Sequence, residues 1–430
     1  MLTALRHAIG GTPTERSDLD RYRDARVRAI VQHAYEHVPY YRELFDVHGV
    51  DSRAVHGVAD LSAIPTTSKQ DLQAREEPAL IARGLDARRL IVRRTTGSTG
   101  QPLHIRRTWS EERLLGAFRW RALRALGWKV TDRHVEIEEP LAHDANDLRA
   151  VHAVFERMGL LRQTRIDALA AADQIAHDLR TARPDVLCGY AGVIAHLSDV
   201  VGAEGLAGVC PRFVATHSDT LTDRMRAAIG RVFRAPVYEI YDCNEFNLIA
   251  WQCAETGALH VCDDSVVLEV LADGSPVAPG ERGEAVITAL HSFAMPFIRY
   301  RIGDVIVQGD AACACGRGFS TIRAVQGRMF DYFPLADGRV VHPYELIAIL
   351  DRTAPWLLRY RMTQERRDHL TVEVVARAAA GNGAIDALRS ALTSFLGPQV
   401  TLEVVLRDQL PLEGSAKLRI CRSLVASEYD

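Results

Sequence analysis

Three features that would place a chain in a membrane, in an export pathway or on a nucleic acid are missing from this sequence. No apolar run approaches the roughly 20 residues that a helix needs to cross a bilayer. Residues 1–17 contain no continuous apolar stretch of the kind that signal peptides carry. The formal net charge is −3, so no overall positive charge attracts a phosphate backbone. We therefore expect a cytoplasmic protein without membrane or nucleic acid partners.

Cysteine is sparse, with eight thiols in 430 residues. In a large chain without an export signal, these are better read as reduced thiols or metal ligands than as disulfides. The composition, 47% hydrophobic and 25% charged, is that of folded domains and not of a disordered chain. A single hydrophobic core rarely serves so long a chain, so we expect two or more domains.

The hydrophobic pattern predicts alternating helices and strands. Apolar residues recur at helical spacing in residues 21–38, 110–126 and 168–182, and short apolar strand candidates lie at residues 186–188 and 237–241. From about residue 261 the pattern changes to strands separated by Gly, Pro and Asp turns. The last hundred residues resemble a small α+β unit. The sequence thus predicts an α/β fold with a large N-terminal part and a smaller C-terminal part.

A polar, glycine-containing segment separates two strand candidates. It consists of Thr95, Thr96, Gly97, Ser98, Thr99 and Gly100, followed by Gln101 and Pro102. Glycines allow successive backbone N–H groups to point into one concavity, and hydroxyls add donors for phosphate oxygens. The Gly-Lys-Ser/Thr ending of a Walker A loop is absent. Taken alone, such a segment is more often an ordinary polar turn.

This segment resembles the phosphate-binding signature of the adenylate-forming superfamily, and other motifs follow in that family's order. They lie at residues 33–35, 38–41, 61–69, 183–187, 189–190, 240–245, 295–304, 327–328 and 414–419. The chain is most similar to the phenylacetate–CoA ligase-like branch, which includes relatives encoded beside polysaccharide genes. The resemblance covers essentially the whole chain. It implies an adenylate-forming domain over residues 1–328, which binds ATP and the acid, and a mobile C-terminal domain over residues 329–430.

The segment 240–245 resembles the family's aromatic-x-x-x-Glu motif. The resemblance implies that Tyr241 stacks on adenine and that Glu245 helps to hold Mg²⁺ beside the phosphates, a role that suits an ion with few protein carboxylates. Without the family, Glu245 would be read as a solvated residue in a turn after a strand.

Three further residues receive roles from the resemblance. Asp304 ends a segment similar to the family's Arg-Tyr-x-x-Gly-Asp motif and would accept hydrogen bonds from the ribose hydroxyls at a strand end. Arg328 would lie near the ribose and phosphate, at the domain junction. Lys417, in the terminal motif, would neutralise charge that develops on the α-phosphate during adenylation. The ordinary alternatives are a Gly-Asp turn for Asp304 and a solvated tail lysine for Lys417.

The chain departs from the family pattern at two places. Gln101 stands where many relatives have Lys, which removes a charge but leaves the backbone donors. The usual hinge position, acidic or lysine, corresponds to Phe330, with Asp331 one residue later. The identity of the hinge residue is therefore left open.

Four residues form a candidate zinc site. The Cys313 to Arg317 segment resembles a Cys-x-Cys-Gly-Arg element of the same branch, and Cys253 and His260 precede it as in relatives with a Cys…Gly-x-x-His segment. Three thiolates, Cys253, Cys313 and Cys315, with the imidazole of His260 suit a tetrahedral structural zinc ion. Cys262 is the alternative ligand. The competing interpretation is buried free cysteines and an ordinary histidine.

The resemblance implies an acid–thiol ligase that uses ATP, Mg²⁺ and coenzyme A. The enzyme would adenylate a small-molecule carboxylic acid, and the C-terminal domain would rotate before the acyl group passes to a thiol. An aryl or arylacetic acid is the default of the branch, and Phe246 and Trp251 are candidates for its pocket, or else for the core. A carrier-protein pantetheine or an amine remains open as the acceptor, and so does a non-catalytic nucleotide-binding relative. A homodimer is compatible with the sequence, which does not predict the oligomeric state.

Overall fold

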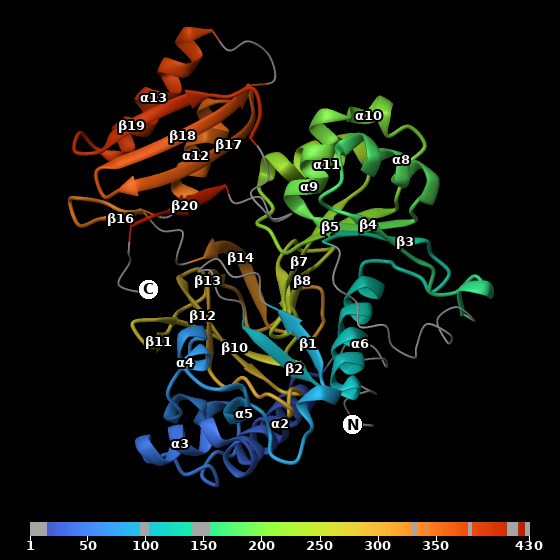
Figure 1. The fold of residues 1–430 in the computed structure, drawn as a ribbon, viewed down its shortest axis with the longest axis vertical. Coiled ribbons are helices and arrows are strands. Elements are labelled where there is room, and N and C mark those ends of the chain that lie inside the picture. Colours follow the sequence, from blue (N-terminus) through green and yellow to red (C-terminus); the bar gives the residue numbers. More distant parts are fainter. Residues whose placement is uncertain are drawn as a thin grey trace.

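The computed structural model describes residues 15–94, 103–139, 155–328, 333–341, 343–376, 381–410 and 420–425. These residues form a mixed α/β structure, as expected. One large sheet runs through most of the molecule, and the C-terminal residues form a separate unit with its own sheet (Figure 1). Within the described ranges, the large sheet has twelve strands in the order β11-β10-β12-β13-β14-β9-β8-β7-β6-β5-β3-β4.

One half of the large sheet is parallel. Its strands are β3 (His134–Glu138), β4 (Gln163–Asp167), β5 (Val186–Tyr190), β6 (Phe213–His217) and β7 (Val237–Cys243). The helices of this region are α6 (Trp109–Ala125), α8 (Ala172–Ala182), α9 (Ala191–Val200), α10 (Gly202–Gly205) and α11 (Asp223–Phe233). Parallel strands end at one edge of a sheet, and ligands of open α/β sheets bind outside that edge.

The other half is antiparallel. Its strands are β8 (Asn247–Gln252), β9 (Leu259–Val261), β10 (Val266–Ala272), β11 (Ser275–Pro276), β12 (Arg282–Ala289), β13 (Tyr300–Gln308) and β14 (Thr321–Arg328). A two-stranded ribbon, β1 (Ile91–Arg94) and β2 (His104–Arg107), stands apart from this sheet. Its register pairs Arg94 with His104, so the expected phosphate loop begins and ends at paired strand ends.

The N-terminal helices pack on the antiparallel half. They are α2 (Arg16–His37), α3 (Pro39–His48), η1 (Val58–Ala63), α4 (Lys69–Gln73), α5 (Glu77–Leu80) and η2 (Ala87–Arg89). Val27 and Ile30 of α2 share a hydrophobic core with Val267 of β10 and Ile287 of β12. Pro39 begins α3, because a proline at the first helical position lacks only an N–H that has no helical partner.

The C-terminal unit has its own hydrophobic core, built from residues 333–421. Its elements are β15 (Phe333–Pro334), β16 (Val340–Val341), α12 (Pro343–Thr353), β17 (Leu357–Arg366), β18 (His369–Ala376), α13 (Asn382–Leu396), β19 (Thr401–Leu406) and β20 (Cys421–Ser423). Arg224 of α11 donates to the carbonyl oxygens of Ala354 and Leu357 and so joins this unit to the parallel half. None of the helices in the described ranges combines the length and apolar character that crossing a membrane requires.

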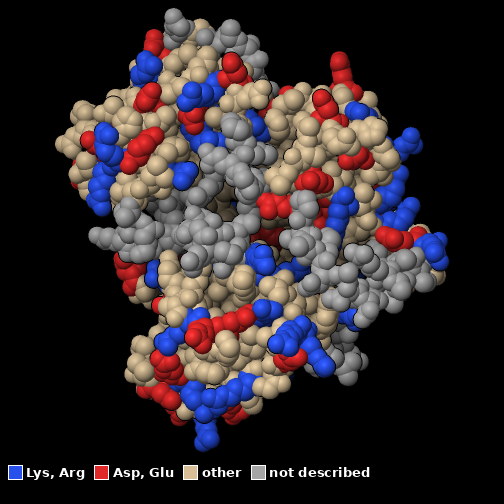
Figure 2. Space-filling model, in the orientation of Figure 1, with Lys and Arg blue, Asp and Glu red and all other residues tan. Residues whose placement is uncertain are grey.

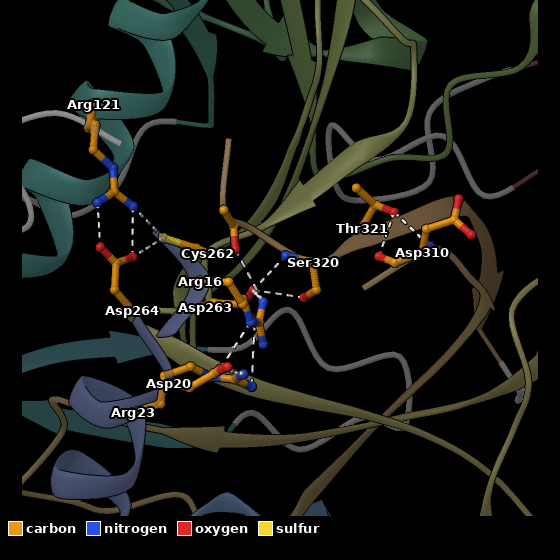
Figure 3. Close-up of polar contacts among 11 residues, drawn as sticks. Arg16, Asp20, Arg23, Arg121, Cys262, Asp263, Asp264, Asp310, Ser320 and Thr321 are labelled. Atoms are coloured by element: carbon orange, nitrogen blue, oxygen red, sulfur yellow. Dashed lines mark hydrogen bonds and ion pairs between the residues drawn. The ribbon is translucent and has the colours of Figure 1, made fainter. Parts of the chain in front are cut away.

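A buried group of charges ties α2 and α6 to the segment after β9. We call it the closed cluster; it consists of Arg16, Arg23, Arg121, Asp263 and Asp264 (Figure 3). Asp263 accepts from the Arg16 guanidinium at 2.9 Å and from the backbone N–H of Ser320 at 2.7 Å. Arg121 forms two hydrogen bonds with Asp264 and lies over the ring of Phe319. Paired in this way, the two buried aspartates hold three parts of the chain together.

Candidate active site

The carboxyl ends of the parallel strands open into a cavity of about 520 Å³. Its walls come from β1, β2, α6, β3, the β6–β8 region, β13 and β14. Three residues that the sequence singled out separately, Tyr241, Glu245 and Asp304, all line it. The fold therefore brings together segments more than sixty positions apart in the chain.

Tyr241 and Asp304 are in direct contact. The Tyr241 hydroxyl donates to Asp304 Oδ2 at 2.7 Å, joining β7 to β13. Asp304 was expected at a strand end, but it lies inside β13. The register of β13 and β14 shifts next to Asp304, and Gly303 before it has φ 81°, a conformation that glycine adopts without a Cβ clash. This irregularity is the local reason that a carboxylate within a strand can face a cavity.

Glu245 lies in the tight connection between β7 and β8. Its side chain is buried and accepts from the Tyr300 hydroxyl at 3.5 Å. Arg107, at the end of β2, donates to the carbonyl oxygen of Glu245 at 2.8 Å. Asn244 donates to the carbonyl oxygen of Arg94, the last residue of β1, at 2.9 Å. Both flanks of the expected phosphate loop are thus fixed beside the Tyr241–Glu245 segment.

Several expected site residues lie outside the described part of the chain. These are Thr95, Thr96, Gly97, Ser98, Thr99, Gly100 and Lys417, together with Gln101 and the hinge positions Phe330 and Asp331. The backbone of Arg328 is described, and it pairs with Asp304 in the ladder between β13 and β14. That pairing brings the backbone of the expected domain junction next to the expected ribose site.

Of the two alternatives left open for Phe246 and Trp251, pocket or core, the structure shows core positions for both. Neither belongs to the described lining of the cavity. Phe246 packs edge-on against Phe297 in one core, and Trp251 packs against Phe319 in another. Phe246, which precedes β8, and Trp251, within β8, are each 1% exposed.

A second group of charges, which the sequence reading missed, lies in the cavity wall. We call it the cavity cluster; it consists of Arg119, His134, Glu136, His217 and Asp242. Glu136 Oε1 lies 3.1 Å from Arg119 Nη2 and 3.0 Å from His217 Nε2, and Glu136 Oε2 lies 3.3 Å from His134 Nε2. Arg119 also pairs with Asp242. A polar alternation in residues 134–138 was the available sequence signal, because His134, Glu136 and Glu138 share one face of β3.

Within the cavity cluster, the neighbours of Glu136 and of His134 shift the pKa of each toward its charged form. Burial opposes ionisation of Glu136, but Arg119, His134 and His217 hold the pKa of Glu136 well below its usual range. Burial likewise disfavours the charged form of His134, yet Cys188 and Glu136 raise the pKa of His134 to about 10. The surroundings therefore favour the carboxylate form of Glu136 and the protonated form of His134.

Glu239, on the same face of β7 as Tyr241, is a second residue that the sequence reading missed. It lines the cavity, and burial raises the pKa of Glu239 to about 7, with Arg226 opposing the shift. Its carboxylate has no hydrogen-bond partner among the residues that the structure describes. An acceptor of this kind beside Tyr241 is available to a ligand.

Charge is unevenly distributed around the cavity. Acidic side chains gather over the ends of the parallel strands, and basic ones lie next to β1 on the opposite lip (Figure 2). The acidic wall contains Glu136, Glu138, Glu139, Asp219, Glu239 and Asp242. The basic lip contains Lys69, Arg93, Arg94, Arg107 and Arg301. The basic lip flanks residues 95–102. Within it, Arg93 and Arg107 pair with Glu112, and Arg301 pairs with Glu284, which also line the cavity.

The four expected metal ligands converge outside this cavity. The ligand atoms of Cys253, His260, Cys313 and Cys315 all lie within 4.8 Å of one another. Pairing of β9 with β14 and the turn after Cys253 bring them together. Burial lowers the pKa of His260 to about 4, with Arg317 contributing, so the imidazole is neutral and able to bind a metal. Cys262, the alternative, instead contacts Arg121 and Asp264 at the closed cluster.

Comparison with known proteins gives one consistent group of relatives. No family model matches the chain. The chain is 27% identical over 369 residues to a phenylacetate-coenzyme A ligase of Escherichia coli, which covers 82% of this chain and 80% of the relative. It is 25% identical over 350 residues to a phenylacetate-coenzyme A ligase of Thermus thermophilus, covering 78% and 76%.

Solved structures give the same fold. The crystal structure of a 2-hydroxyisobutyryl-CoA ligase in its postadenylation state, in complex with 2-HIB-AMP, has a TM-score of 0.77 to this chain. The two are 20% identical, and the match covers 97% of this chain and 92% of that one. The fold is therefore that of CoA ligases that form acyl-adenylates.

Proposed function

We infer that this chain, a member of the adenylate-forming superfamily similar to phenylacetate–CoA ligases, is an AMP-forming acid–thiol ligase. It activates a carboxylic acid as an acyl-AMP and transfers the acyl group to coenzyme A. The observation that carries this function is the meeting of Tyr241, Glu245 and Asp304 in one cavity, beside both flanks of the segment 95–102. If Asp304 only formed a turn and Glu245 were only a solvated residue, there would be no reason for them to meet in one cavity.

The chemistry assigns separate tasks to the two sides of the cavity. A carboxylate oxygen of the acid attacks the α-phosphate of ATP, and pyrophosphate leaves; the thiol then attacks the acyl carbon, and AMP leaves. The protein supplies positioning and charge stabilisation. Tyr241 faces the adenine, Asp304 accepts from the ribose hydroxyls, and Glu239 is an acceptor for the adenine amino group. Glu245 is the ligand for Mg²⁺, which neutralises phosphate charge when it is bound.

Arg328 and residues outside the described ranges complete the proposal. Residues 95–100 cradle the phosphates, Arg328 lies near the ribose and phosphate, and Lys417 neutralises the charge that develops on the α-phosphate. By resemblance to the family, the C-terminal unit, residues 329–430, rotates against residues 1–328 between the two half-reactions. Lys417→Ala should then abolish acyl-AMP formation and spare acyl transfer from pre-made acyl-AMP.

ATP–pyrophosphate exchange with a panel of acids tests the adenylation step. Asp304→Ala should raise the KM for ATP at least about tenfold, because a hydrogen bond to a charged acceptor contributes about 1.5–3 kcal/mol. Glu245→Gln should instead lower turnover and weaken the response to Mg²⁺. Asp310→Asn is the matched control, since Asp310 follows β13 but is exposed and outside the cavity. Unchanged ATP dependence in both active-site variants would overturn the assignment.

The acceptor thiol needs its own test. Coenzyme A is the acceptor that the relatives' names specify, whereas a carrier-protein pantetheine and an amine use the same acyl-AMP. Rates of AMP release from pre-made acyl-AMP with each acceptor separate the three. A strong preference for free coenzyme A is the expected result.

We also propose that Cys253, His260, Cys313 and Cys315 bind a structural zinc ion. The four donor atoms have the composition and proximity that tetrahedral zinc requires, and Cys315 Sγ lies 3.5 Å from His260 Nε2. Arg317 donates to Cys315 Sγ at 3.4 Å, and Thr256 Oγ1 lies 3.2 Å from Cys313 Sγ, contacts that orient thiolate ligands.

Metal analysis of protein purified without chelator should find about one equivalent of zinc per chain. Cys315→Ser should lose the metal and lower the melting temperature, whereas Cys210→Ser, which changes an exposed thiol, should do neither. Zinc-free wild-type protein of unchanged stability would contradict the site.

A further inference from the structure

The cavity extends beyond the residues assigned to the nucleotide. Tyr241, Asp304 and Glu245 lie on β7, β13 and the turn after β7, and the phosphate side lies next to Arg94. On the other side of β7 the cavity continues between α6 and the strands β3 and β6, where the cavity cluster is found. Because the carboxylate of the acid must meet the α-phosphate, the rest of the acid extends into this part.

The walls of this part are apolar on one side and charged on the other. Trp120 and Leu123 of α6 and Ile240 of β7 supply apolar surface. Opposite them are Glu136 and Asp242, which lie on the two sides of the His217 ring, 3.0 Å from Nε2 and 3.8 Å from Nδ1 respectively. A bare hydrocarbon group here would cover ionised carboxylates without replacing their water, which is unfavourable.

The charged wall has spare acceptors and few spare donors. His217 uses both ring nitrogens, one on Glu136 and one on Ser218 Oγ at 3.0 Å. Arg119 donates to both carboxylates. A carboxylate offers about four acceptor positions. Among the described residues, Glu136 is approached by three groups, and Asp242 Oδ1 only by Ser218 Oγ at 3.5 Å.

The backbone supports this arrangement. Ser218, between His217 and the cavity-lining Asp219, has φ 66°, in the left-handed region that non-glycine residues rarely occupy. Such conformations persist where the surrounding structure enforces them, often at ligand sites. The strained residue holds its hydroxyl between His217 and Asp242.

Resting on the proposed function, we propose that the acid substrate carries a hydrogen-bond donor on its apolar body, and that Glu136 and Asp242 recognise this donor. A hydroxyl and an amino group share this chemistry. A second carboxylate does not, because the two ionised residues would repel it. Glu136 and Asp242 are therefore specificity-determining residues of the acid site. The bare aryl acid expected from the family resemblance is a poor substrate.

Matched sets of acids test this directly by ATP–pyrophosphate exchange. Each set contains an unsubstituted acid, its hydroxy derivative and its amino derivative, built on benzoate, phenylacetate and short alkanoates. At least one derivative should exceed its unsubstituted parent about 100-fold or more in kcat/KM, because a site built for a polar group rejects the analogue that lacks it. The hydroxy and amino members show which donor the enzyme selects.

Two conservative variants test the residues. Asp242→Asn and Glu136→Gln keep the side-chain shape and should reduce the preference for the donor-bearing acid at least tenfold. The preference is a ratio, so partial misfolding of one variant does not mask it. Asp185→Asn is the control, because Asp185 precedes β5 and pairs with Arg133 outside the cavity; its ratio should match that of the wild type.

The outcomes separate this proposal from the proposed function. If an unsubstituted acid supports exchange as well as its derivatives, or if both variants keep the wild-type ratio, the donor proposal is wrong and adenylation stands. Exchange with none of the donor-bearing acids also overturns the donor proposal. If calorimetry then detects no binding of Mg–ATP, the proposed function falls with it.

Discussion

Helix α6 contributes one arginine to each of two carboxylate clusters with opposite surroundings. Arg121 belongs to the closed cluster, where Arg121 and Asp264 are 2% and 0% exposed. Arg119, two positions earlier, belongs to the cavity cluster, where it and Asp242 are 18% and 12% exposed. Residues two apart on a helix do not share a face, so one arginine enters the core and the other the cavity.

Under our proposal, the same pairing chemistry serves structure in the closed cluster and recognition in the cavity cluster. In the closed cluster, Asp263 contacts Arg16, Arg23 and Ser320, and aromatic rings lie over Arg121, so that both aspartates and Arg121 are buried. In the cavity cluster, Glu136 and Asp242 keep acceptor positions that face open space. Exposure to a cavity, and not the presence of an ion pair, distinguishes the recognition site.

The largest expected effect is on stability, in the closed cluster. Asp264→Asn leaves the Arg121 guanidinium buried without its counter-charge and should cost about 3–5 kcal/mol in the free energy of unfolding, measured by urea denaturation. Exchange activity per folded molecule should not change. The double variant Arg121→Met/Asp264→Leu removes both charges and should recover much of the loss. A double variant no more stable than the single one would contradict the assignment.

In the cavity cluster, a substitution should affect the kinetics with the acid more than the stability of the protein. Glu136→Gln should lower kcat/KM for the preferred acid at least about tenfold, with the KM for ATP unchanged. The cost in unfolding free energy should be about 1–2 kcal/mol, because water in the cavity solvates Arg119 and the histidines. If Glu136→Gln lost as much stability as Asp264→Asn and kept normal kinetics with the acid, the cavity cluster would have a structural role like that of the closed cluster.

The pH dependence of stability should come from the cavity cluster. The pKa of His134 is raised from 6.5 to about 10 in the folded state. The charged form is therefore favoured by folding, so its stabilisation is complete below pH 6.5 and is lost as the pH rises towards 10. Melting temperatures across this range should fall in the wild type and fall less in His134→Gln. Parallel curves for the two proteins would rule out His134 as the source.

The smallest effect is expected at the rim of the closed cluster. Arg16 is one-third exposed, and Asp263 keeps Ser320 and Arg23 as partners when Arg16 is removed. Arg16→Ala should therefore cost only about 0.5–1.5 kcal/mol in denaturation experiments. A loss as large as that of Asp264→Asn would mean that the contribution of an ion pair to the free energy of unfolding does not depend on its burial in this cluster.

Several helices could be predicted because the spacing of apolar residues within a short segment indicates a helix. The helical spacing of residues 21–38, 110–126 and 168–182 corresponds to α2, α6 and α8. The ten-residue β17, with charged residues between its apolar positions, was not predicted. Its apolar residues Leu357, Tyr360 and Met362 do not follow a strict alternation, and the strand is defined by its pairing with β18 and β20.

The sequence by itself was enough to predict the α/β fold class and to nominate Tyr241, Glu245 and Asp304 for the nucleotide site and four residues as metal ligands. It did so because each lies in a short segment whose residue types resemble a known pattern. Only the tertiary structure decided that Phe246 and Trp251 are core residues and that Arg119, Glu136, His217 and Asp242 form one wall. The contacts of this wall span 17, 81 and 123 positions in the chain. The physical reason is that side-chain surroundings depend on which strands and helices pack together, and local periodicity carries no information about that packing.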